Sequence, residues 1–142
     1  MITEMMRRLA AVAALGMLGV TASMGVARAD ETSFTWDTIH RGDCRMYGAT
    51  WTIHSDGTAT FDGNLLSSTG GDAWLMHAEL FDHDDAYLAN LTVDGPPADP
   101  GDIGKFVMNL QFAHRDTHWI TYGKYDRNLY PLIGSMKLRS DC

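Results

Sequence analysis

An alternation of apolar and polar residues constrains the fold of this chain more than any other feature. In the run RMYGATWTIHSDGTATFDGNLL, residues 45–66, small or apolar side chains recur at every second position on both sides of Ser55-Asp56-Gly57. They are Tyr47, Ala49, Trp51 and Ile53 before the turn signal and Ala59, Phe61, Gly63 and Leu65 after it. Because successive side chains of a β-strand point to opposite faces, this pattern predicts a hairpin with one buried face.

The length of the turn decides which residues of this hairpin face each other. A two-residue turn at Asp56-Gly57 would divide the apolar side chains between both faces, which is the wrong register for a core. A three-residue loop with Gly57 in the left-handed conformation keeps them on one face. We therefore predict a type I turn followed by a G1 bulge, which pairs Trp51 with Phe61 and Ile53 with Ala59.

Strand signals continue along the rest of the chain. A second hairpin candidate has Trp74, Met76, Ala78 and Leu80 on one face and a polar turn at about residues 83–85. Pro and Gly residues mark 94–104 as a surface loop. Further strands are expected within 105–112, 118–125 and 135–142, and Pro131 limits the segment 126–134 to a single helical turn.

About seven short strands and no amphipathic helix predict an all-β domain. The architecture expected is a compact, mostly antiparallel sandwich or a small barrel. A lipocalin-like barrel is the alternative.

The first 29 residues have the pattern of a secretory signal peptide. Arg7 and Arg8 precede an apolar run from Leu9 to about Val26, and the segment ends in Ala27-Arg28-Ala29, a small-residue cleavage site. A membrane anchor is the alternative, but Gly, Ser and Thr interrupt the run and the cleavage site follows it at once. We predict a signal peptide at 1–29 and one secreted extracellular domain at 30–142, with no membrane attachment after cleavage.

The mature domain is acidic. It keeps 17 acidic and 8 basic residues, a net charge of −9. Such a domain is not expected to follow a phosphate backbone, so nucleic acid is excluded as a partner.

The two cysteines, Cys44 and Cys142, both lie in the mature region. In an oxidising compartment an even number of cysteines indicates a disulfide, and two cysteines allow only one pairing. Free or metal-binding thiols are the alternative, although no CxxC spacing accompanies either cysteine. A bridge that closes so long a loop stabilises a fold by about 4–5 kcal/mol in the chain-entropy model.

Three motifs resemble known binding or catalytic sites. Arg41-Gly42-Asp43 resembles an adhesive tripeptide, but the adjacent Cys44 favours a turn that leads into the disulfide. Residues 82–85 offer carboxylates to Ca²⁺, yet they break the EF-hand pattern and favour a solvated turn. His114 and His118 have the spacing of a zinc-protease motif without its glutamate. The sequence assigns no catalytic residue, cofactor or metal ligand.

The four tryptophans are many for a domain of this size. Trp51 and Trp74 lie on the apolar faces of their strands and are expected in the core. The alternation does not decide whether Trp36 and Trp119 are buried or exposed, and we consider them as possible ligand contacts.

The runs FTWDTIHRGDCRMYGATWTIHSDGTATF, DAWLMHAELFD and LYPLIGSMKLRSDC together resemble a group of small secreted actinobacterial proteins classed as a domain of unknown function. The resemblance extends from about Thr32 to Cys142. It implies export of a compact disulfide-linked domain in a bacterium, and it implies no activity.

We expect a secreted, non-enzymatic binding or interaction domain, with contacts on loops such as 94–104. A closed barrel would favour a small apolar ligand, and a flat sandwich would favour a protein or a glycan. A secreted hydrolase is the alternative, and it requires two or more of Glu79, His77, His114, His118 and neighbouring Asp residues to converge in one cleft. A protease inhibitor that presents the loop 94–104 is the third hypothesis.

Overall fold

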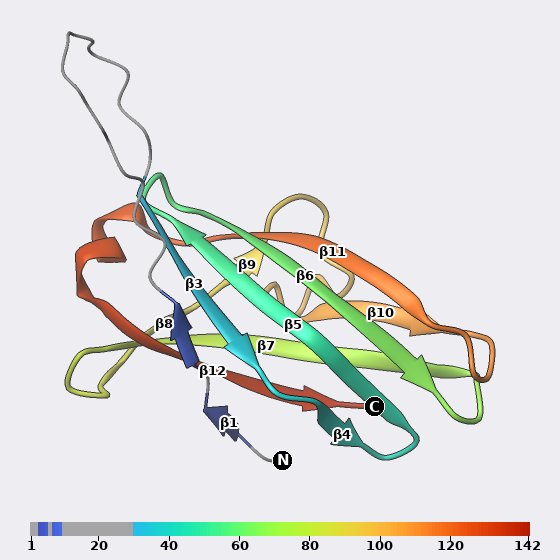
Figure 1. Cartoon of the computed structure of the whole chain (residues 1–142). Coiled ribbons are helices and arrows are strands. Elements are labelled where there is room, and N and C mark those ends of the chain that lie inside the picture. Colours follow the sequence, from blue (N-terminus) through green and yellow to red (C-terminus); the bar gives the residue numbers. More distant parts are fainter. Residues whose placement is uncertain (1–2, 6, 10–29) are drawn as a thin grey trace, which may run out of the picture.

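Two antiparallel sheets face each other in the computed structural model, which describes residues 3–5, 7–9 and 30–142 (Figure 1). The seven-stranded sheet contains, in spatial order, β2 (Arg7–Leu9), β3 (Glu31–Trp36), β5 (Cys44–His54), β6 (Thr58–Ser67), β11 (Thr117–Lys124) and β9 (Thr92–Val93), with β4 (Ile39–Arg41) also paired to β5. The five-stranded sheet contains β1 (Thr3–Met5), β12 (Ile133–Asp141), β7 (Asp72–Asp82) and β10 (Phe106–Leu110), with β8 (Tyr87–Asn90) also paired to β7. The predicted all-β sandwich is confirmed, and the two sheets of the described residues do not close into the alternative lipocalin-like barrel.

The predicted signal peptide, residues 1–29, lies outside the described residues except for β1 and β2. β1 pairs with β12 and β2 pairs with β3, each antiparallel. Cleavage after Ala29 stays a prediction.

The β5–β6 hairpin has the register that its turn predicts. Trp51 pairs with Phe61, and Ile53 pairs with Ala59. Gly57 has a φ of 95°, and its N–H donates to the carbonyl of His54 over 3.2 Å. The positive φ explains why glycine stands at this position.

A bulge in the first half of β5 changes which of its side chains face the core, in contrast to the regular alternation that the sequence predicts. Tyr47 pairs with Asn64 and Thr50 pairs with Asp62, so Gly48 and Ala49 together oppose a single residue of β6. The extra residue changes which side chains face inward. Met46 is buried and Tyr47 is only half-buried, so the prediction of Tyr47 on the buried face was wrong.

The core lies between the sheets and is rich in aromatic rings. Trp51 packs against Phe61 and Phe106, with ring centroids 5.3 and 5.1 Å apart, and Phe61 packs against Trp119 at 5.1 Å. From the five-stranded sheet, the buried side chains include the predicted set of Trp74, Met76, Ala78 and Leu80, together with Met136 and Leu138. Burial of these side chains is the main source of stability in such a domain.

The remaining connections also follow the sequence signals. Asp82 closes the turn after β7, since its carboxylate accepts hydrogen bonds from the N–H groups of Asp84 and Ala86. The expected single helical turn is a 3-10 helix, Arg127–Leu132, capped by Asp126 and containing Pro131. Among the described residues, no helix has the length and hydropathy that a membrane span requires.

Candidate functional site

The residues expected to form a hydrolase site are divided between three places. His77 and Glu79 lie on the outer face of β7, where His77 Nε2 is 2.7 Å from Asp102 and Glu79 is 2.7 Å from Arg139 Nε. Each of these side chains is therefore held by an ionic partner on the five-stranded sheet or its flanking loop.

The other two candidate histidines belong to different surfaces. His118 projects from β11 on the outside of the seven-stranded sheet, 57% exposed, and contacts Asp62 at 3.0 Å. His114 lies in the loop between β10 and β11. Of the four candidates, His77 and Glu79 thus share one face of β7, each with a partner of its own, and His114 and His118 lie apart from them.

Trp36 and Trp119 belong to the core. Their exposed fractions are 6% and 4%. Both lie on the inward parity of their strands, Trp36 with Phe34 on β3 and Trp119 with Gly123 on β11. The structure therefore offers neither indole to a partner at the surface, contrary to the expectation that they are ligand contacts.

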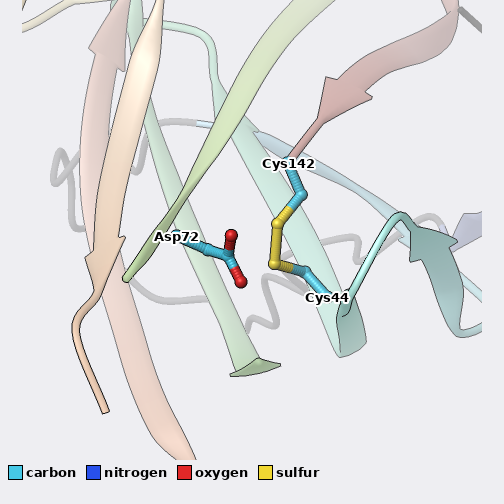
Figure 2. A group of neighbouring side chains, drawn as sticks. All are labelled: Cys44, Asp72 and Cys142. Carbon is cyan, nitrogen blue, oxygen red and sulfur yellow. A yellow bond between two sulfur atoms is a disulfide. The ribbon is translucent and has the colours of Figure 1, made fainter. Parts of the chain in front are cut away.

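The predicted disulfide between Cys44 and Cys142 is confirmed (Figure 2). The carboxylate of Asp72 lies beside it and accepts hydrogen bonds from the hydroxyls of Ser67 and Thr69, at 2.5 and 3.1 Å. Among the described residues, one group of side chains has the spacing of metal ligands, and it consists of Cys44, Asp72 and Cys142. Because the two sulfur atoms are bonded to each other, they are not available as thiolate ligands.

The Arg-Gly-Asp triplet forms the turn that leads into this bridge. Arg41 Nε donates to the carbonyl of Ser140 at 3.2 Å, and its Nη1 donates to the carbonyl of His40 at 2.6 Å. Asp43 accepts a hydrogen bond from Thr69 at 3.1 Å. Both charged side chains are thus held by neighbouring segments, which favours the turn interpretation over receptor binding.

A surface pocket of about 390 Å³ opens at this end of the sandwich. We call it the loop-end pocket, and its lining is His40, Gly42, Asp43, Cys44, Arg45, Leu66, Ser68 and His114. Three chain segments contribute: the β4–β5 turn with the start of β5, the end of β6 with the loop after it, and the β10–β11 loop. The sequence alone missed this pocket because its residues are far apart in the chain.

The walls of the loop-end pocket are held together by backbone contacts. His114 has a φ of 56°, and its N–H donates to the carbonyl of Ser67 at 2.8 Å. Gly71 N–H donates to the carbonyl of Gln111 at 3.0 Å. A Cβ at Gly70 would lie 2.8 Å from that same carbonyl oxygen, so the two loops pack closely at this glycine.

A second surface of interest is the outside of the seven-stranded sheet. On the face opposite the core, Ser33, Thr52 and Thr60 lie side by side on β3, β5 and β6, and Thr60 pairs with Tyr122 of β11. We call this surface the hydroxyl face after Ser33, Thr35, Thr50, Thr52, Thr58 and Thr60, which share it with Ile120 and Tyr122 and with the charged or titratable residues Glu31, His54, Asp62 and His118. The burial of alternate residues on each strand places these side chains on the outside.

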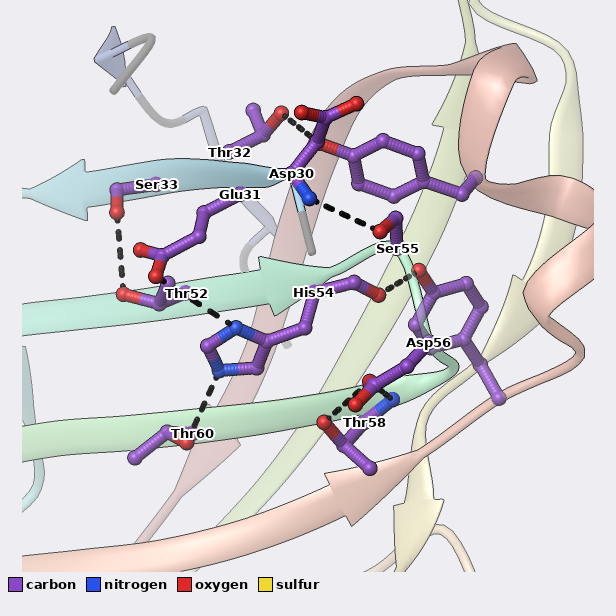
Figure 3. A network of polar contacts seen from close by, with 12 residues as sticks. Asp30, Glu31, Thr32, Ser33, Thr52, His54, Ser55, Asp56, Thr58 and Thr60 are labelled. Atoms are coloured by element: carbon purple, nitrogen blue, oxygen red, sulfur yellow. Dashed lines mark hydrogen bonds and ion pairs between the residues drawn. The ribbon is translucent and has the colours of Figure 1, made fainter. Parts of the chain in front are cut away.

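The hydroxyls are ordered by contacts between strands (Figure 3). Ser33 and Thr52 share a hydrogen bond of 3.0 Å, and Thr60 lies 3.4 Å from His54 Nε2. The other ring nitrogen of His54 is 4.0 Å from Glu31. These contacts reduce the rotamer freedom of the side chains before any ligand arrives.

Two large side chains stand exposed at the edge of these hydroxyls. Tyr122 is 55% exposed and Ile120 is 47% exposed, on β11. The pattern HWITYGKY did not assign this strand a face, because Trp119 lies on one parity and Ile120 and Tyr122 lie on the other.

Hydrogen bonds and burial shift the pKa values of several side chains in the domain. The hydroxyl of Tyr47 donates to Asp116, which raises the pKa of Tyr47. The hydrogen bond from His77 lowers the pKa of Asp102, and the bond from Lys105 lowers the pKa of Asp99. Burial, with the charges of Tyr130 and Asp56, raises the pKa of Tyr125 strongly.

The comparison with protein families gives a match to a family of unknown function, DUF6294, over residues 50–142. No curated protein and no solved structure gives a significant match. The matched segment begins within β5 and includes every later strand and the C-terminal half-cystine. The resemblance to a domain of unknown function is thereby confirmed, and the chain belongs to the family of unknown function DUF6294.

Proposed function

We propose that this chain is a secreted, non-enzymatic binding domain that holds a neutral glycan on its hydroxyl face. The observation that carries the proposal is the row of cross-strand neighbours Ser33, Thr52, Thr60 and Tyr122. It places ordered hydroxyls next to an exposed aromatic ring.

This combination fits the chemistry of sugars. A sugar presents hydroxyls that both donate and accept hydrogen bonds, and serine and threonine hydroxyls do the same. It also presents an apolar C–H face, which packs on the exposed ring of Tyr122. Because Ser33 and Thr52 are already bonded to each other, part of the entropy cost of ordering the site is met before binding.

The other partner classes fit the surface less well. The core of a protein interface is normally built on several large apolar or aromatic anchors, whereas the hydroxyl face exposes only Ile120 and Tyr122 of that kind. The loop-end pocket has the charged side chains Asp43 and Arg45 and two histidines in its lining, which disfavours a purely apolar ligand. Secretion rests on the predicted signal peptide, and the disulfide is compatible with it.

Binding to soluble neutral polysaccharides tests the proposal. Mature protein, residues 30–142, is run in native gels containing a glucan, a xylan or a mannan, and retardation measures affinity. Retardation by at least one of them is expected. Tyr122→Ala should weaken binding by about tenfold through loss of ring contact. Thr52→Val, which removes a hydroxyl at nearly constant volume, should weaken it less.

Tyr87→Ala is the matched control. Tyr87 is 58% exposed but lies on the five-stranded sheet, so its loss should leave retardation unchanged. Equal weakening by Tyr87→Ala, or no retardation in any of the gels, contradicts the proposal. Release of reducing sugar from the same polysaccharides would instead support the hydrolase alternative.

A further inference from the structure

The positive charges of this acidic domain are unequally compensated. On and near the five-stranded sheet, Lys105, Lys137 and Arg139 each contact a carboxylate, at 2.9, 3.6 and 2.7 Å. At the loop end, by contrast, Arg45 and Arg115 make no ion pair among the described residues. They lie over the rings of Tyr47 and Phe112, at 5.6 and 4.4 Å from the centroids.

Arg45 and two histidines line the loop-end pocket together. His40 pairs with Arg45 across β4 and β5, and His114 lines the pocket from the β10–β11 loop. These side chains offer N–H donors to a common space, and a guanidinium presents a planar set of donors that matches the oxygens of a carboxylate or phosphate.

The carboxylates near this pocket already have donors of their own. Asp43 accepts from the hydroxyl of Thr69, and Asp116 accepts from the hydroxyl of Tyr47. Neither forms an ion pair with Arg45 in the described residues. The guanidinium of Arg45 therefore has an aromatic ring as its neighbour and no carboxylate partner among the described residues.

We propose that the loop-end pocket binds a small oxyanion group, held by Arg45, His40 and His114. The walls are formed in advance, because the N–H of His114 is bonded to Ser67 and Gly70 packs against the backbone of the opposite loop. Charge-assisted hydrogen bonds supply the affinity. The group is either a free anion such as phosphate or the carboxylate of an acidic sugar. This inference does not rest on the proposed glycan function, since it concerns different residues.

Titrations followed by two-dimensional ¹H–¹⁵N NMR of the mature domain test the inference. Inorganic phosphate, glucuronate and neutral glucose are added separately at constant ionic strength. Saturable shifts of the amide signals of Gly42, Arg45, Ser68 and His114 are expected with phosphate or glucuronate and not with glucose. Phosphate alone identifies a free-anion site, glucuronate alone identifies an acidic-sugar site, and both together identify a general oxyanion site.

Substitutions in the pocket distinguish a specific binding site from general attraction between the protein and an anion. Arg45→Gln and His114→Gln should each raise the dissociation constant by about tenfold, the size expected for one charge-assisted hydrogen bond. Lys124→Gln is the matched control, because it removes an exposed cation from the far end of β11. Linear shifts without saturation, or equal weakening by Lys124→Gln, would overturn the proposal. The spectra themselves report whether each variant is folded.

Discussion

The carboxylate of Asp102 lies 2.7 Å from His77 Nε2, which ties the loop between β9 and β10 to the outer face of β7. Lys105 adds a second contact within the same segment by pairing with Asp99 at 2.9 Å. The loop that the sequence marks as a surface segment is thus held in place by charged side chains.

The first prediction concerns the pH dependence of this contact. The hydrogen bond from His77 holds the pKa of Asp102 below its usual range. Because the unfolded-state pKa is higher, at about 3.9, ionised Asp102 stabilises the fold above that pH. The stabilisation is lost as the pH falls through the lower folded-state pKa. Asp102→Asn should therefore reduce the free energy of unfolding at neutral pH and have little effect in strong acid.

Urea unfolding of both proteins at several pH values measures this difference. Asp37→Asn is the control, because Asp37 is exposed and has no partner among the described residues. A loss of stability in Asp102→Asn that is the same at all pH values would show that the ionised carboxylate of Asp102 is not its cause.

The second prediction concerns the alkaline titration of the five tyrosines. Hydrogen bonding to Asp116 raises the pKa of Tyr47, and burial raises the pKa of Tyr125. Ultraviolet absorbance should therefore show tyrosines that ionise above the ordinary value of about 10. Asp116→Asn should bring one of them down, and Tyr47→Phe should remove that one. An unchanged titration in Asp116→Asn would refute the assignment.

The third prediction concerns the hairpin turn. A Cβ at Gly57 would lie 3.0 Å from the carbonyl oxygen of Tyr125, and the φ of 95° is unfavourable for alanine. Gly57→Ala should lower the free energy of unfolding by about 1–3 kcal/mol. Gly95→Ala is the matched variant, since its φ of 115° is similar and nothing lies within 4 Å of its Cβ position. Chemical denaturation should show the smaller loss for Gly95→Ala, and equal losses would rule out the contact with Tyr125.

The fourth prediction concerns the disulfide. Cys44 and Cys142 are separated by 98 positions, so the bridge restricts the unfolded chain strongly. Reduction should lower the free energy of unfolding by about 4–5 kcal/mol in the chain-entropy model. Thermal melting with and without reductant measures the change. The double variant Cys44→Ala/Cys142→Ala should melt at the same temperature in both conditions, and a wild-type melting temperature that ignores reductant would contradict the prediction.

The local pairing of β5 and β6 was predictable because a single loop length gathers the apolar side chains on one face. Gly57 supplies the one backbone conformation that this loop requires. The same reasoning placed Trp74 and Met76 in the core, where both are fully buried. In β7 an unbroken apolar row on one parity decided the buried face, although Leu75 and Phe81 lie on the other parity.

Strands without an unbroken apolar row on one parity were not predictable in the same way. In β11, the periodicity does not show whether Trp119 or the pair Ile120 and Tyr122 faces the core. The choice is made by long-range packing, since Trp119 meets Phe61 in the core. The loop-end pocket could not be predicted from the sequence either, because His40 and His114 come together only in the folded domain.

The bulge at Gly48 determines more than the position of one tyrosine. Beyond it, Thr50 and Thr52 face outward; before it, Arg45 faces outward and Cys44 faces inward, toward Cys142. If β5 were a regular strand without the bulge, the phase of its first half would reverse, which would turn Arg45 toward the core and Cys44 toward solvent. The disulfide and the outward position of Arg45 therefore depend on the bulge, which Gly48 accommodates with its φ of 62°.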